Sequence, residues 1–109
     1  MAHIVIIGAG IGGMPMAYEM RELARPDDVV TVVSTSPTFH FVPSNPWVAV
    51  DWRQRGDIEL DIEPALARRN IGFSSAGAKR VHPAENRVEL GDGSSIVYDY
   101  LVIATGPQL

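Results

Sequence analysis

Three short runs of apolar, mostly β-branched residues divide the chain: residues 4–7, 29–33 and 100–104. Each run is too short for a helix, and the first ends directly at a glycine. Unbroken apolar runs of this length are typical of strands that are buried on both faces of a parallel sheet. We therefore expect three buried parallel strands.

The segment between the first two runs has the spacing of a helix. Small and apolar residues recur every three or four positions from Gly13 to Ala24, which predicts an amphipathic helix that ends near Arg25. Pro15 is compatible with this helix because it falls in the first turn. Strand, loop, helix and strand then form one right-handed βαβ unit.

The middle of the chain is less regular. Residues 34–56 mix aromatic residues with prolines, which is typical of a packed excursion over a core. The alternation of Ile58, Leu60 and Ile62 indicates extended chain. A short helix is expected from about residue 62 to 69, with Asp61 as its cap, and a third short strand at 71–74.

Three further strand candidates lie at residues 78–82, 87–90 and 95–98. They are separated by Pro-Ala-Glu-Asn and Gly-Asp-Gly-Ser, which are both turn compositions. This part of the chain therefore predicts a short antiparallel β-meander.

Composition limits the chemistry of the chain. At 109 residues it forms one small domain, and its formal charge of −4 argues against a nucleic-acid partner. The absence of cysteine excludes a disulfide scaffold and any thiol redox chemistry by this chain alone. The three histidines are isolated, so no metal site is expected. Neither a signal peptide nor a transmembrane stretch is indicated.

The loop after the first strand has the spacing Gly-x-Gly-x-x-Gly. Gly8 permits a tight turn, Gly10 lets a pyrophosphate approach the backbone, and Gly13 allows the helix to pack closely. The following helix directs its free N–H groups and positive dipole end at the phosphates. A plain glycine-rich turn is the alternative, but the strand–loop–helix–strand context favours dinucleotide binding. The candidate loop residues are Gly8, Ala9, Gly10, Ile11, Gly12 and Gly13.

The end of the second strand carries Ser34 and Thr35, where an acidic residue usually binds the ribose about 20 residues beyond the glycines. A hydroxyl can hydrogen-bond a ribose without ionic strength, although Ser34 could instead only start a turn. The missing acid weakens an NAD assignment, and the lack of a nearby arginine weakens NADP.

The glycine fingerprint, the meander and the final Tyr-Asp-x-Leu-Val-Ile-Ala-Thr-Gly strand, in this order, resemble the two-dinucleotide-binding-domain flavoproteins related to glutathione reductase. More narrowly, residues 10–19, 39–47 and 98–107 resemble sulfide:quinone oxidoreductases. Serine at the ribose position is also similar to that family. The resemblance covers the whole chain.

The resemblance implies an α/β fold: a three-layer Rossmann-like FAD-binding half-domain with a parallel sheet and a short antiparallel β-meander. Residues 1–109 would be the N-terminal part of that FAD-binding domain. The adenosine would lie near the glycine loop, Ser34 and Thr35. The remaining implied contacts are Gly77 and Ala78 with the adenine, Val42, Pro43 and Ser44 with the flavin side, and Thr105 and Gly106 with the pyrophosphate.

In the intact enzymes of that family, cysteines take electrons from sulfide and pass them through FAD to membrane quinone. Such an enzyme is peripheral on the bacterial cytoplasmic membrane. Since this chain holds no cysteine, we expect it to be an N-terminal fragment with no catalytic residue and no activity of its own. We also expect it to form a homodimer or larger species through an open apolar face, or else to bind FAD poorly because the pocket lacks a wall.

Two alternatives stay open. The chain could instead be the N-terminal part of an NADH:quinone dehydrogenase-like pyridine nucleotide-disulfide oxidoreductase. It could also be a non-catalytic nucleotide-binding module.

Overall fold

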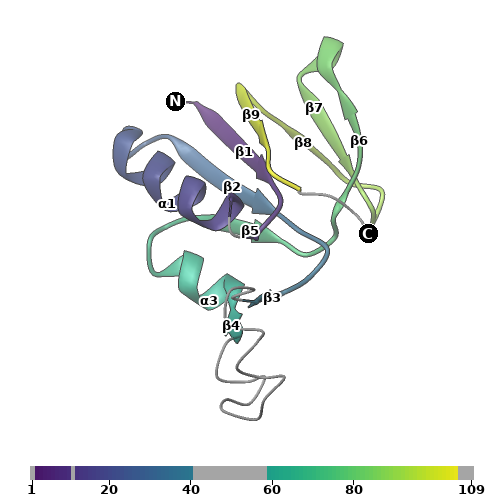
Figure 1. Ribbon diagram of the computed structural model, residues 1–109. Helices are drawn as coiled ribbons and strands as arrows, with labels where there is room; N and C mark the ends of the chain where they lie inside the picture. The colour runs from purple at the N-terminus through teal and green to yellow at the C-terminus, as the bar shows by residue number, and fades with distance from the viewer. Residues whose placement is uncertain (1, 11, 41–58, 106–109) are drawn as a thin grey trace.

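The computed structural model describes residues 2–10, 12–40 and 59–105. At its centre is a parallel sheet with the strand order β5-β2-β1-β9 (Figure 1). Its strands are β1 (His3–Ile7), β2 (Val29–Val33), β5 (Gly72–Ser74) and β9 (Tyr100–Ile103). All three neighbouring pairs are parallel, so the carboxyl ends of the four strands meet at one edge. The predicted parallel strands are confirmed.

The interior strands are buried on both faces, as their unbroken apolar runs predict. In β1, Ile4 and Ile6 face one layer while Val5 and Ile7 face the other. The last strand differs from the prediction of a buried strand. In β9, the side chain of Ile103 is 64% exposed, because β9 is the outermost strand of this sheet.

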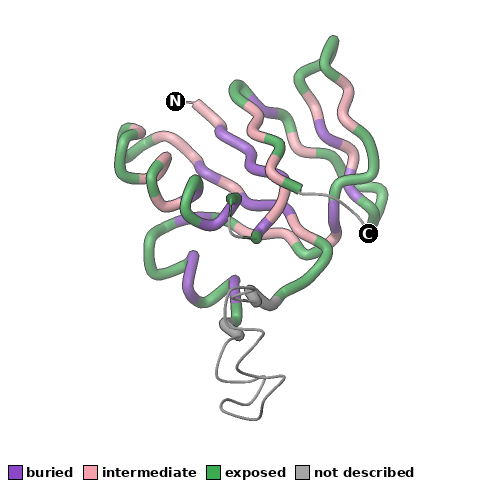
Figure 2. Tube along the Cα trace, viewed as in Figure 1, coloured by how far each residue is buried: buried purple, intermediate pink, exposed green. Residues whose placement is uncertain are grey.

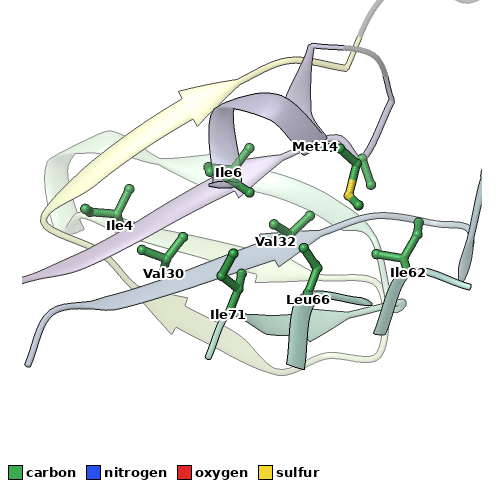
Figure 3. Close-up of a cluster of buried hydrophobic side chains, with 10 residues drawn as sticks. Ile4, Ile6, Met14, Val30, Val32, Ile62, Leu66 and Ile71 are labelled. Atoms are coloured by element: carbon green, nitrogen blue, oxygen red, sulfur yellow. The ribbon is translucent and has the colours of Figure 1, made fainter. Parts of the chain in front are cut away.

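Two helices cover one face of the sheet. They are α1 (Gly13–Leu23) and α3 (Ile62–Ala67), and both end two residues before the predicted positions. Their buried side chains meet those of β1 and β2 in a single core (Figure 3). This core comprises Ile4, Ile6, Ala9, Met14, Ala17, Val30, Val32, Ile62, Leu66 and Ile71. Burying each large aliphatic side chain stabilises the fold by about 1.5–3 kcal/mol.

The predicted cap of the second helix is wrong in detail. Asp61 occupies the N-cap position of α3, but its side chain makes no capping hydrogen bond. The backbone N–H of Ile62 donates instead to the carbonyl of Pro37, at 2.9 Å. Asp61 belongs to β4 (Glu59–Asp61), which pairs antiparallel with β3 (Thr38–His40), and this pairing brings Pro37 to the start of the helix. The predicted packed excursion falls mostly on residues 41–56, outside the described residues.

The opposite face of the sheet carries the meander. It consists of β6 (Ala78–His82), β7 (Arg87–Leu90) and β8 (Ser95–Val97), paired antiparallel as the sequence predicts. Val88, Leu90 and Tyr98 pack on the second face of β1 and β2. Burial is therefore concentrated in the central strands, while the meander and β9 are largely open (Figure 2). The expected three layers are confirmed.

No helix within the described ranges is long and apolar enough to span a membrane.

At the amino edge of the sheet, the carboxylate of Asp28 joins two segments of the chain. Asp28 accepts hydrogen bonds from the backbone N–H groups of Ala2, at 2.8 Å, and Arg25, at 3.0 Å. These two bonds tie the start of β1 to the loop that joins α1 and β2. Both hydrogen bonds lower the pKa of Asp28 below its usual value of 3.8, and the bond from Ala2 has the larger effect.

We predict that Asp28→Ala lowers the unfolding temperature at neutral pH, with a difference that shrinks in acid. The folded pKa is depressed, so the stabilisation by Asp28 is present above the usual carboxyl pKa and is lost as pH falls through the folded pKa. Thermal unfolding across this acid range checks the prediction. Asp27→Ala, at the exposed neighbouring aspartate, is the matched control. An equal loss of stability for the two variants at every pH would contradict it.

Candidate dinucleotide-binding site

The candidate site lies at the carboxyl edge of the sheet, where the ends of β1, β2 and β9 are joined by backbone hydrogen bonds. The N–H of Gly8 donates to the carbonyl of Val33, and the N–H of Ala104 donates to that of Ile7, each at 2.8 Å. The glycine loop is therefore held between the two strands that flank β1. In open parallel sheets this edge is where ligands bind.

Two glycines of the loop are required by the protein itself. Gly8 has a left-handed φ of 107°, and a Cβ there would overlap the carbonyl of Ala104. At Gly13, a Cβ would overlap the carbonyl oxygen of Gly8. The first turn of α1 can approach the end of β1 so closely only because Gly13 lacks a side chain, and the chain after β9 can approach the loop because Gly8 lacks one.

Gly10 is different. A Cβ at this exposed position meets no atom within 4 Å, and its φ lies outside the left-handed region. Neither the backbone nor the packing of the described residues therefore requires glycine here. A group bound against the loop would require it, since a side chain would occupy the space through which a pyrophosphate reaches the backbone. The open space at Gly10 thus fits the cofactor predicted from the sequence.

The start of α1 is also suited to an anion. Its N-cap, Gly12, provides no side-chain hydrogen bond, and the first turn contains no acidic residue. The N–H groups at this end and the positive end of the helix dipole are not neutralised by a side chain of the cap or first turn. A phosphate group can supply that negative charge.

Ser34 starts a turn, as the alternative interpretation proposes. Its Oγ accepts a hydrogen bond from the N–H of Ser36 at 3.2 Å, and its own N–H donates to the carbonyl of Ser74 at 2.9 Å. This turn does not exclude a ribose contact, because a hydroxyl that accepts one bond still has a proton to donate. Both interpretations are therefore compatible with the geometry.

Gly77 lies directly against Thr35. It has a φ of 74°, and a Cβ there would be 2.6 Å from the Cγ2 methyl carbon of Thr35. Ala78 follows as the exposed first residue of β6. The structure therefore brings the two predicted adenosine segments, 34–35 and 77–78, into contact. Ser74 was not predicted: its Oγ accepts the N–H of Ala76 at 3.3 Å and shapes this loop. Its signal is a hydroxyl residue at the carboxyl end of a strand.

The other predicted residues are placed as follows. Thr105 is exposed, and its Cα lies 3.1 Å from a Cβ built on Gly8, so it adjoins the glycine loop. Ala9 directs its side chain into the core beneath α1, so only its backbone can face a ligand. Ile11, Val42, Pro43, Ser44 and Gly106 lie outside the described residues.

A hollow of about 390 Å³ lies at the opposite, amino edge of the sheet. Arg21 and Asp28 contribute to its lining. The guanidinium of Arg21 donates to the backbone carbonyls of Asp28, at 2.7 Å, and Arg25, at 2.5 Å. Arg21 therefore joins the end of α1 to the following loop, and this hollow is remote from the glycine loop.

The parallel sheet, the glycine loop and the uncapped helix define a dinucleotide-binding α/β domain. The family model described as pyridine nucleotide-disulphide oxidoreductase matches residues 2–108. The chain belongs to this family.

Within this family, the chain is similar to sulfide:quinone enzymes. The chain is 44% identical over 107 residues to a sulfide-quinone reductase of Aquifex aeolicus, covering 98% of this chain and 25% of the relative. It is 30% identical to a mitochondrial sulfide:quinone oxidoreductase of Dictyostelium discoideum, covering 100% of this chain and 24% of the relative.

A solved structure gives the same result. The sulfide:quinone oxidoreductase of Aquifex aeolicus superposes with a TM-score of 0.94 at 43% identity, over 100% of this chain and 25% of that one. The chain thus spans about a quarter of the length of the relatives that it matches.

We predict opposite effects of a methyl group at two positions of the glycine loop. Gly8→Ala should lower the free energy of unfolding by about 2–4 kcal/mol, because it combines left-handed strain with overlap at Ala104. Gly10→Ala should leave that free energy unchanged or raise it by up to about 1 kcal/mol, since the added methyl meets no atom. Urea unfolding of the ligand-free chain measures both, and similar losses would contradict the assignment.

Proposed function

We propose that this chain is the FAD-binding N-terminal region of a sulfide:quinone oxidoreductase. Such an enzyme oxidises sulfide and passes the electrons through FAD to membrane quinone. The observation that carries the proposal is the likeness of the whole chain to a solved sulfide:quinone oxidoreductase, at a TM-score of 0.94 and 43% identity. The open space at Gly10 independently supports a bound dinucleotide.

In this proposal the chain supplies the binding groups for FAD. The backbone of the glycine loop and the start of α1 hold the pyrophosphate, together with Thr105 and Gly106. Ser34 and Thr35 hold the ribose, Gly77 and Ala78 face the adenine, and Val42, Pro43 and Ser44 approach the flavin side. When bound, FAD supplies a reversible two-electron redox centre.

The end of β2 departs from a standard NAD site: Ser34 and Thr35 are neutral where such a site usually carries a carboxylate. Because FAD and NAD share the same adenosine ribose, the choice of FAD rests on the relatives. The same fold is found in more distant proteins: the structure of NDH2 from Plasmodium falciparum in complex with NADH is 21% identical to this chain. An identity of 43–44% to sulfide:quinone enzymes supports the assignment of this chain to an enzyme of that kind.

The catalytic thiols of the proposed enzyme would come from outside this chain, which contains no cysteine. We therefore expect no sulfide-dependent quinone reduction by the 109 residues alone. Attachment to the face of the bacterial cytoplasmic membrane is likewise assigned to the whole enzyme, which is about four times as long in the relatives.

We predict that Gly10→Val abolishes FAD binding while the ligand-free fold is retained. The valine side chain would fill the space next to the loop without meeting another protein atom at its Cβ. Ser34→Ala should weaken binding by only about 0.5–1.5 kcal/mol, the contribution of one neutral hydrogen bond. Flavin absorbance after gel filtration and titration calorimetry measure both effects.

Circular dichroism of the ligand-free variants is the control for folding. Full FAD occupancy in Gly10→Val would overturn the assignment of the pyrophosphate to this loop. An unchanged dissociation constant in Ser34→Ala would mean that Ser34 only stabilises the turn and does not bind the ribose.

We also propose that the isolated chain self-associates along the outer edge of β9. Tyr100 and Ile103 on this strand are each 64% exposed, and Val97 just before it is 65% exposed. An unpaired strand edge flanked by large apolar side chains invites pairing with another chain. A homodimer or larger species is therefore expected.

We predict that light scattering at micromolar concentration detects this association and that Ile103→Lys reverses it. A lysine on an edge strand opposes pairing because its charge would have to be desolvated. Leu23→Lys, at a 76% exposed position on α1, is the matched control and should leave the association intact. A wild-type chain that is monomeric under these conditions would contradict the proposal.

A further inference from the structure

The loop between β5 and β6, residues 75–77, is held between two segments that are distant in sequence. On one side, the Cγ2 methyl of Thr35 lies against Gly77, where a Cβ would be only 2.6 Å from it. On the other side lies Gly91, at the end of β7 in the meander. Its N–H donates to the carbonyl of Gly77 at 3.0 Å.

Gly91 touches this loop too closely for any side chain. A Cβ built there would be 2.5 Å from the carbonyl oxygen of Ala76. The φ of Gly91 lies outside the left-handed region, so its turn alone does not require glycine. The contact with Ala76 does require it.

The turn that carries Gly91 is itself held by hydrogen bonds. The N–H of Leu90 donates to the carbonyl of Ser94 at 2.8 Å, and the N–H of Ser94 donates to Oδ1 of Asp92 at 3.0 Å. A methyl group on Gly91 would overlap the carbonyl oxygen of Ala76. Both sides of this contact are held by hydrogen bonds, since the N–H of Ala76 is bound to Ser74 Oγ at 3.3 Å, so relief of the overlap would displace Gly77 as well as the turn.

We propose that Gly91 is a positioning residue: through its contact with Ala76 and Gly77, the meander sets the affinity of the site for the adenosine part of its cofactor. The inference rests on the proposed FAD-binding function, in which Gly77 and Ala78 face the adenine. Backbone groups recognise a ligand only where their direction is held, because a hydrogen bond weakens steeply as its angle bends. Gly91, directly after β7, supplies that restraint from outside the residues proposed to contact the ligand.

In this proposal Thr35 also positions Gly77, from the opposite side of the loop. The roles of its methyl group and its hydroxyl group can be tested separately by substitution. Its methyl group packs on Gly77, whereas its hydroxyl is the group proposed to hold the ribose. Thr35→Ser removes the methyl and keeps the hydroxyl, while Thr35→Val keeps a methyl and removes the hydroxyl. The first change tests positioning, and the second tests direct binding.

The experiment compares Gly91→Ala with Gly72→Ala in the full 109-residue chain. Both variants add one methyl without left-handed strain, but at Gly72 it meets the side chain of Thr31, away from the loop. FAD and ADP, which share the adenosine diphosphate part, are titrated by calorimetry. Amide hydrogen exchange of residues 76–78 is measured without ligand.

We expect Gly91→Ala to weaken the binding of both FAD and ADP by about twofold to tenfold, the range for one misplaced hydrogen bond. It should also speed amide exchange at residues 76–78. Gly72→Ala should change neither, whatever its effect on the unfolding temperature. Equal affinities and equal exchange in Gly91→Ala and the wild type would overturn the inference.

Two further outcomes separate the inference from the proposed function. If the wild-type chain binds neither FAD nor ADP, the proposed FAD-binding function is overturned. The proposed positioning role of Gly91 is then overturned as well. If Gly91→Ala fails to fold, Thr35→Ser provides the test. It should weaken FAD binding, whereas Gly72→Ala should leave FAD affinity unchanged. Full affinity in Thr35→Ser would then overturn the positioning of the loop by its neighbours.

Discussion

The close approach of α1 to the end of β1 is the contact on which the rest of the structure depends. A side chain at Gly13 would overlap the carbonyl oxygen of Gly8, so the helix and strand meet backbone to backbone. This contact directs the first turn of α1 toward the carboxyl edge of the sheet. It also lets Met14 and Ala17 reach the core formed with β1 and β2. The position of this helix end and the packing of the first layer thus share one cause.

Five of the described glycines fall into two groups with different physical origins. Gly8, Gly13, Gly77 and Gly91 are glycines because another part of the protein occupies the space where a side chain would lie. At Gly10 that space is empty. The first group assembles the edge of the sheet from distant segments, and the second leaves room for a molecule that is not part of the chain.

β1 and β9 are neighbouring strands of similar apolar composition, but they differ in how far they are covered by other elements. β1 is paired on both sides and covered on both faces, whereas β9 is paired only with β1 among the described residues. Tyr100 and Ile103 are consequently exposed, although the run to which they belong is as apolar as β1. In a protein whose relatives are about four times as long, such a surface is available for contacts outside these 109 residues.

Local pattern was sufficient for the elements themselves. Apolar runs of four or five residues predicted the parallel strands, helical spacing predicted α1, and turn compositions separated the strands of the meander. These signals are short-range, because strand and helix periodicity are properties of neighbouring residues. The glycine spacing also predicted a dinucleotide ligand, since this inference depends only on the strand before the loop and the helix after it.

The tertiary structure decided which segments touch. Sequence could not reveal that Pro37 satisfies the N–H of Ile62 in place of the Asp61 side chain, or that β9 is an edge strand. Nor could it distinguish Gly91 from an ordinary turn glycine, because the atom that requires it, the carbonyl oxygen of Ala76, is 15 positions away in the chain (91 − 76). Contacts between distant segments arise from the packing of whole layers, and a residue pattern records only the chemistry of each position, not its partner.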